Sequence, residues 1–235
     1  MAVGGASGIG AARIGGGWRL LSGGRAAVAS MLNQATYFEM KARAGTIGAA
    51  LAAVIDREVP QGVRVHLVGH SFGGRLVTST ASAMRTPVRS LSLLQAAFSH
   101  NAFGTGIGRR KIDGGFRRVV ADGVVSGPIM VTHTRRDTAV GIFYAIASSV
   151  SGEIAKGMVT SRLVGGPADL HGGLGANGAL AMNDGEAVVH VATVGETPDL
   201  VCAKVNNVLC DAIIGGHSDV ANPDVGALVW RALSA

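Results

Sequence analysis

The residues best suited to chemistry in this chain are a serine, an aspartate and a histidine that lie far apart in the sequence. Ser71 is the middle residue of GHSFG (residues 69–73), a Gly-x-Ser-x-Gly pattern that follows the β-forming run 63–68 and precedes a helix-compatible stretch. This order is typical of a nucleophile elbow, a strained strand-to-helix turn that exposes the serine hydroxyl. Gly69 and Gly73 have no side chains, and we expect that a side chain at either position would collide with other atoms of the turn. We therefore predict that Ser71 is a nucleophile rather than part of a surface turn.

A serine hydroxyl is a weak nucleophile until a histidine removes its proton and a carboxylate holds that histidine. In enzymes with this elbow the acid follows the serine along the chain, and the base follows the acid. The apolar stretch 129–134 predicts a strand, and Asp137 comes just after it, where the acid is expected. The other aspartates considered have no such apolar run directly before them: Asp113, Asp122, Asp169, Asp184, Asp199 and Asp211.

The base is expected on a loop after the last strand. His217 fits this position, because it lies in a Gly-flanked segment (215–219) between the apolar run 200–209 and a predicted closing helix over 223–233. Of the remaining histidines, His66 and His133 lie on predicted strands and His70 adjoins the nucleophile. His100, His171 and His190 are harder to exclude from the sequence.

These residues resemble those of the α/β-hydrolases, and more narrowly those of a bacterial subfamily of predicted serine hydrolases with esterase or lipase character. The similar blocks are residues 36–48, 63–78, 90–100, 114–120, 126–141 and 215–226. The resemblance implies catalytic Ser71, Asp137 and His217, and hydrolysis through a covalent acyl-enzyme. It implies the reaction class better than the substrate.

The beginning of the chain departs from that family's pattern. Residues 1–62 show no convincing strand, so we expect an α/β-hydrolase-like, mostly parallel sheet flanked by helices and shortened at the N-terminus. The stretch 25–58 is helix-compatible, with breaks expected near Gly45 and Gly48. The backbone N–H of Phe72 can supply one oxyanion donor, since it follows the nucleophile.

The second oxyanion donor is unassigned in the sequence. The glycine-rich residues 15–18 are a candidate, although no strand leads into them. A competing motif, GGASGIG (residues 4–10) with Tyr37 and Lys41, is similar to the cofactor turn and catalytic pair of a short-chain dehydrogenase. It lacks a leading strand, and too few residues separate its two parts, which argues against an oxidoreductase.

Length and composition favour a single α/β domain over residues 1–235, since 48% of the residues are hydrophobic and 15% are charged. Residues 1–25 are expected to be a flexible, glycine-rich N-terminus, and 99–127 and 151–185 to be lids or surface insertions. Further strands are expected over 88–94, 187–194 and 200–209, and further helices over 73–85 and 139–150.

No cofactor or metal is expected, because Cys202 and Cys210 lack metal-site spacing and are interpreted as reduced core thiols. The net charge of +6 comes with only 4% aromatic residues, so we expect no nucleic-acid partner. No apolar run is long enough to span a bilayer, which predicts no stable membrane insertion and a cytoplasmic location. The basic loop 109–118 is either solvated or attracts acidic or phosphate-bearing substrates, and the oligomeric state is open.

The predicted function is therefore that of an esterase: a serine hydrolase that cleaves short- to medium-chain carboxylic esters of small molecules. Two alternatives stay open. One is another acyl hydrolase on the same triad, namely a thioesterase, amidase or lipase. The other is a non-catalytic hydrolase-fold binding protein that lacks a complete oxyanion hole.

Overall fold

The computed structural model describes residues 39–143 and 166–235. In this part of the chain a five-stranded, all-parallel sheet has the strand order β1-β2-β3-β5-β4. The strands are β1 (Val65–His70), β2 (Val88–Leu94), β3 (Ile129–His133), β4 (Ala187–Val191) and β5 (Val205–Leu209). The helices are α2 (Phe72–Ala83), α3 (Arg117–Ala121), α5 (Leu174–Asn177) and α6 (Pro223–Ser234), together with a π-helical turn η1 (Ala139–Phe143) and a helix over 39–58. The prediction of a parallel α/β sheet flanked by helices is confirmed.

The strand register places the carboxyl ends of the central strands level with one another. His70 of β1 pairs with Leu94 of β2, Leu94 with Thr132 of β3, and His133 with Leu209 of β5. The loops after these four strands therefore emerge at the same edge of the sheet, where ligands bind in open parallel sheets.

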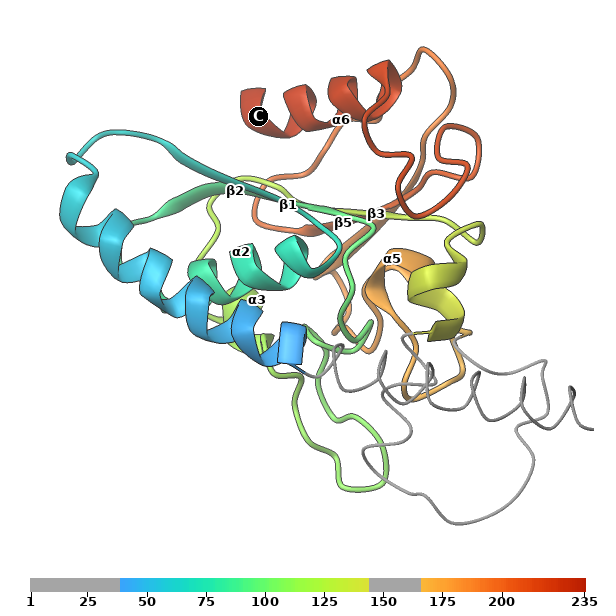
Figure 1. Ribbon diagram of the computed structural model, residues 1–235, viewed down its shortest axis with the longest axis horizontal. Coiled ribbons are helices and arrows are strands. Elements are labelled where there is room, and N and C mark those ends of the chain that lie inside the picture. Colours follow the sequence, from blue (N-terminus) through green and yellow to red (C-terminus); the bar gives the residue numbers. More distant parts are fainter. Residues whose placement is uncertain (1–38, 144–165) are drawn as a thin grey trace, which may run out of the picture. The chain divides into compact units, whose positions relative to one another are not determined.

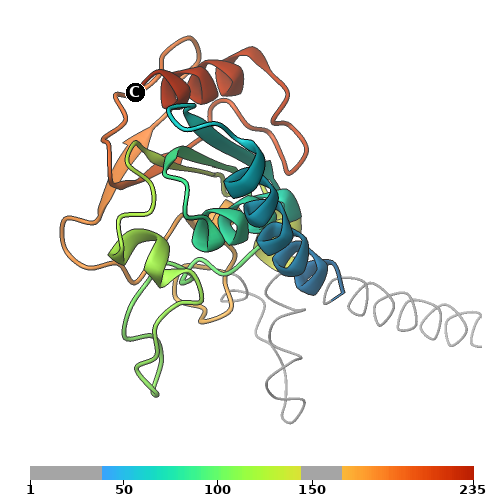
Figure 2. The same cartoon turned by 90° about the vertical axis from the view of Figure 1, so that its left-hand side faces the viewer.

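Helices cover both faces of the sheet. In both views α6 lies on one face, whereas α2 lies on the other (Figures 1 and 2). Beneath α6, Val225 and Leu228 of that helix pack with Met130 of β3 and Val208 of β5 in a buried cluster. This burial of apolar side chains anchors α6 to the central strands.

The helix over 39–58 lies alongside α2 and runs through both glycines at which a break was expected. That expectation was wrong. At Gly48 a Cβ atom would come within 2.8 Å of Ser79 Cβ and 3.1 Å of Thr80 N, so the glycine allows the two helices to pack closely. Close to Gly45, the Ser79 hydroxyl donates to the Gly45 carbonyl at 2.9 Å. Gly48 therefore serves helix packing, and neither glycine ends the helix.

Two predicted strands are shorter in the structure than in the sequence. The run 200–209 forms a strand only from Val205, because the Asn206 side chain accepts from Val201 N–H at 2.8 Å and donates to its carbonyl at 2.9 Å, which closes a turn. β4 ends at Val191, just before a turn in which the Thr193 hydroxyl donates to Glu196 at 2.9 Å. Of the predicted helix 139–150, the described part is the turn η1.

The two segments expected to be lids or surface insertions contribute to the interior where they are described. In 99–127, Phe103 and Phe116 are buried and pack edge-on and tilted against Phe98 and each other. Arg117 of α3 forms a two-pronged ion pair with Glu186 at 2.7 and 2.5 Å. In 166–185, Leu174 is fully buried. Their role as lids stays a prediction.

Several expectations fall outside the described residues: the flexible N-terminus 1–25, the motif 4–10, the segment 15–18, Tyr37 and residues 151–165. In the part of the chain that is described, no helix is long and apolar enough to cross a membrane. Of the two cysteines expected in the core, Cys210 is buried, and its burial raises the pKa of the thiol to about 12. Cys202 is exposed, so that expectation was wrong for it.

Candidate active site

Ser71 occupies the turn between β1 and α2 in a strained backbone conformation. Its φ of 56° and ψ of −124° are unusual for a residue with a side chain, and such conformations cost about 1–3 kcal/mol. The turn is held by three backbone hydrogen bonds. Ser71 N–H donates to the Leu94 carbonyl at 3.1 Å, and the Ser71 carbonyl accepts from Gly74 and Ala97, both at 3.0 Å. The elbow is thus tied to the end of β2.

The two glycines of the motif have different roles. A Cβ atom at Gly69 would lie 2.5 Å from the carbonyl carbon of Gly73 and 2.7 Å from the nitrogen of Gly74, so the first turn of α2 passes directly over this position. At Gly73, no described heavy atom other than those of its chain neighbours and the backbone of its own helix lies within 4 Å of an added Cβ. The expectation of a collision is therefore confirmed for Gly69 and wrong for Gly73. Gly74 is the second close approach, since a Cβ there would lie 2.5 Å from that of Ala96.

The structure brings the three predicted side chains together. His217 Nε2 lies 2.9 Å from Ser71 Oγ, and His217 Nδ1 lies 2.9 Å from Asp137 Oδ2. The Asp137 side chain is fully buried, whereas 23% of the His217 side chain is exposed. A proton on Nδ1 that is donated to the carboxylate leaves Nε2 as an acceptor for the serine hydroxyl. This is the arrangement a serine nucleophile needs.

Asp137 is positioned by the loop that follows β3. Its Oδ1 accepts from Val140 N–H at 2.9 Å, while its own N–H donates to the Thr134 carbonyl at 3.2 Å. The Thr134 hydroxyl donates to Asp211 at 2.8 Å, and Asp211 also accepts from the side chain of Arg135 at 2.6 Å. These contacts join the loop after β3 to the loop after β5.

The loop that carries His217 is closed by its own polar side chains. The carboxylate of Asp219 accepts from Gly215 N–H at 2.8 Å. The Asn222 side chain donates to the Ile213 carbonyl at 3.0 Å, and it also caps α6 by accepting from Val225 N–H at 3.0 Å. The start of the last helix and the histidine loop are therefore one connected unit.

Two residues that contact the triad are not predicted from the sequence. Gln95 is fully buried with a φ of 44°. Its Nε2 donates to the Gly175 carbonyl at 2.9 Å and lies 3.4 Å from Asp137 Oδ2, and its Oε1 accepts from the Thr132 hydroxyl at 2.8 Å. A glutamine directly after the apolar run 88–94 was the available signal.

The second missed residue is His70. Its Nε2 lies 2.8 Å from the backbone carbonyl of His217, and the two imidazole rings are 4.9 Å apart. The sequence indicates no role for His70, because it adjoins the nucleophile. In the structure, His70 joins the end of β1, next to Ser71, to the loop that carries His217.

The rival histidines have other partners. His66 bonds to Ser90 at 2.8 Å, and His190 bonds to Asn206 at 3.0 Å. His100 lies 3.2 Å from the side chain of Asn177, and its burial lowers its pKa to about 4. Burial likewise lowers the pKa of His133 to about 4. His171 lines a cleft described below.

Several rival aspartates also have partners away from His217: Asp113 with Thr105, Asp122 with Arg118, Asp199 with Arg231 and Asp211 with Thr134.

The predicted oxyanion donor Phe72 is the first residue of α2, directly after Ser71. Residues 15–18, the candidate second donor, lie outside the described residues. Among the described residues no cluster of His, Cys, Asp or Glu is suited to hold a metal ion.

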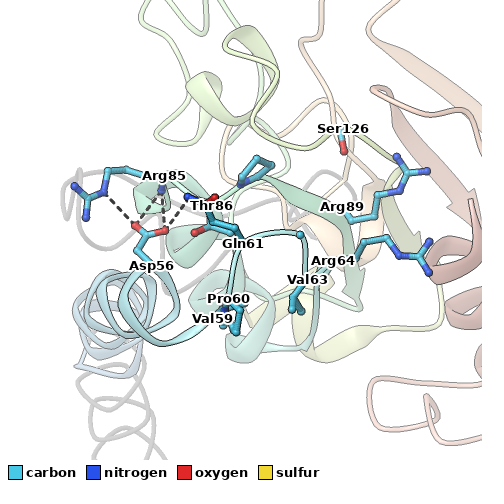
Figure 3. A pocket seen from close by; sticks show the side chains of 12 residues that line it. Asp56, Val59, Pro60, Gln61, Val63, Arg64, Arg85, Thr86, Arg89 and Ser126 are labelled. Atoms are coloured by element: carbon cyan, nitrogen blue, oxygen red, sulfur yellow. Dashed lines mark hydrogen bonds and ion pairs between the residues drawn. The ribbon is translucent and has the colours of Figure 1, made fainter.

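Two of the clefts formed by the described residues lie at different ends of the sheet. A cleft of about 940 Å³ is lined by Arg75 in the first turns of α2, Phe98 after β2, the loop 107–116 and residues 170–171. A cleft of about 620 Å³ lies near the amino ends of β1 and β2 (Figure 3), away from the triad.

In the second cleft, the carboxylate of Asp56 accepts hydrogen bonds from the backbone N–H groups of Thr86 and Arg85 (Figure 3). These bonds, led by that of Thr86, lower the pKa of Asp56 to about 2. The Asp56 carboxylate therefore stabilises the chain segment between α2 and β2.

Comparisons with protein-family models, with curated proteins and with solved structures each find no match.

Proposed function

We propose that this protein is a serine hydrolase of the α/β-hydrolase type that cleaves carboxylic esters through a covalent acyl-enzyme. The observation that supports the proposal most directly is the continuous hydrogen-bonded chain from Ser71 through His217 to Asp137. The strained elbow and the level carboxyl ends of the strands support it as well. Chain order, turn geometry and side-chain contacts agree on the same three residues.

In the proposed mechanism, His217 Nε2 takes the proton of the Ser71 hydroxyl as Oγ attacks the ester carbonyl. Asp137 accepts from Nδ1–H and stabilises the imidazolium that forms. The Phe72 N–H donates to the oxyanion of the tetrahedral intermediate. His217 then protonates the leaving alcohol, and the Ser71 ester remains. Water, deprotonated by the same imidazole, releases the carboxylic acid and restores the serine.

The test is hydrolysis of p-nitrophenyl butyrate together with labelling by a fluorophosphonate probe. We expect Ser71→Ala to remove labelling and to lower kcat by about 10⁴-fold or more, as losing a triad nucleophile does. His217→Ala is expected to lower kcat comparably, because no other base contacts the hydroxyl in the described residues. Ser126→Ala is a matched control, since Ser126 lines the distant cleft.

Two results would overturn the proposal. One is Ser71→Ala protein that is still labelled and retains its turnover. The other is folded wild-type protein that is neither labelled nor active on any ester, which would favour a binding protein on the same fold.

A further inference from the structure

The cleft beside α2 is lined by cationic side chains from several separate parts of the chain. Lys41 comes from the helix over 39–58, Arg75 from α2, and Arg109 and Arg110 from the loop after β2. His171 lines the same cleft from a further segment. Residues distant in the sequence thus gather positive charge at one hollow of the surface.

Two connections along the chain place the cleft close to the proposed nucleophile. Arg75 is the fourth residue of α2, the helix that begins directly after Ser71. Phe98 directly follows Ala97, whose N–H donates to the Ser71 carbonyl at 3.0 Å. A substrate whose carbonyl lies at Ser71 therefore has the cleft within the reach of a short chain.

Among the described residues that line this cleft, the only carboxylate is already engaged. Asp113 accepts from the Thr105 hydroxyl at 2.6 Å and from Gly106 N–H at 3.2 Å within its own loop. Elsewhere in the lining, burial and the neighbouring Arg75 charge lower the pKa of Lys41. An anion in the cleft would relieve this repulsion between cations.

The cleft also has an apolar wall. Phe98 and Phe116 are both buried, and the guanidinium of Arg75 lies 5.3 Å from the centre of the Phe116 ring. Ile112 and Leu170 line the cleft and are largely exposed. An apolar wall with a charged rim fits a hydrocarbon chain that ends in an anionic group.

We propose that the substrate is an ester whose acyl chain ends in an anionic oxygen group, a carboxylate or a phosphate, and that this group is bound by Arg75, Arg109 and Arg110. The inference rests on the proposed ester hydrolysis and names the substrate class of the same site. Because Arg109 and Arg110 are exposed and Arg75 is half-buried, Arg75 is the main specificity-determining residue.

The test compares p-nitrophenyl hydrogen adipate with p-nitrophenyl hexanoate, which has the same chain length without the charge. We expect kcat/KM to be about tenfold or more higher for the adipate ester in the wild type, mainly through KM, with the preference weakening at high salt. Arg75→Gln is expected to remove most of that preference, and Arg75→Lys to restore part of it.

The variant Arg109→Gln/Arg110→Gln provides a second measure on an exposed loop, in case Arg75→Gln fails to fold. Arg64→Gln, in the cleft at the amino ends of the strands, is the matched control and is expected to keep the preference. Inhibition of hexanoate hydrolysis by free adipate or by inorganic phosphate identifies which anionic group the cleft prefers.

Equal or faster hydrolysis of the hexanoate ester by wild type, with Ser71 still labelled by fluorophosphonate, would overturn this inference and leave the hydrolase proposal intact. An unchanged preference in both arginine variants would overturn it as well. Absence of both labelling and hydrolysis would remove the hydrolase proposal, and this inference with it.

Discussion

Substituting the two outer glycines of the elbow by alanine separates a steric requirement from a mere sequence pattern. In Gly69→Ala the new methyl group would lie 2.5 Å from the Gly73 carbonyl carbon and 2.7 Å from the Gly74 nitrogen. Both neighbours are backbone atoms of the first turn of α2, so neither can move aside as a flexible side chain would. Overpacking of this kind typically costs 1–3 kcal/mol and occasionally more, and we expect about 3 kcal/mol here.

Gly73→Ala adds the same methyl group four residues later, where no described heavy atom outside the chain neighbours and the helix's own backbone lies within 4 Å. Gly73 is the second residue of α2, and replacing a helical glycine by alanine stabilises a helix by up to about 1 kcal/mol. The two variants are therefore expected to differ by about 3–4 kcal/mol in the free energy of unfolding, although both replace a glycine by alanine.

Urea unfolding followed by circular dichroism measures the difference, and fluorophosphonate labelling of Ser71 in the folded fraction reports on the elbow itself. We expect Gly69→Ala to lower the unfolding midpoint and the labelling rate, and Gly73→Ala to preserve both. Equal stability of the two variants, or a larger loss in Gly73→Ala, would refute the close approach of α2 to Gly69.

Two further predictions concern stability. In the helix over 39–58, Gly48→Ala is expected to cost about 1–3 kcal/mol because its methyl group would meet Ser79 Cβ at 2.8 Å. Gly45→Ala, whose Cβ would lie 3.9 Å from Arg75, is expected to gain up to about 1 kcal/mol; urea midpoints that rank the two in the opposite order would contradict the packing. Burial of His100 lowers its pKa from 6.5 to about 4, so the unfolded chain binds more protons between these values and stability falls as the pH drops from 6.5 to about 4. The loss from this residue is about 3 kcal/mol, and a His100→Gln protein whose urea midpoint shows the same acid dependence as wild type would exclude it as the cause.

The sequence predicted those parts of the site that follow from the geometry of a parallel sheet. Asp137 and His217 were found by their position after apolar runs, because the carboxyl ends of parallel strands share one edge. Gln95 occupies the same kind of position after β2 but has no pattern of its own, and its contact with Asp137 depends on a backbone φ of 44° that the sequence does not reveal.

Tertiary contacts decided the points at which sequence reasoning failed. Gly48 looked like a helix break because glycine lowers helix propensity, yet the approach of α2 to that position makes a glycine necessary there. Gly73 looked like a steric necessity because it belongs to the motif, yet its surroundings in the described structure are open. Cys202 looked like a core residue because of the apolar run around it, which in fact turns before β5 begins.

Asn222 links the last helix to the loop that carries the proposed base. One amide side chain both starts α6 and holds the segment that bears the imidazole. Val225 and Leu228 pack α6 against the strands. The position of the His217 imidazole therefore depends on the hydrophobic packing between α6 and the sheet. Loosening of that packing is therefore expected to misalign the proposed base while Ser71 stays in place, so the proposed activity would be lost before the fold.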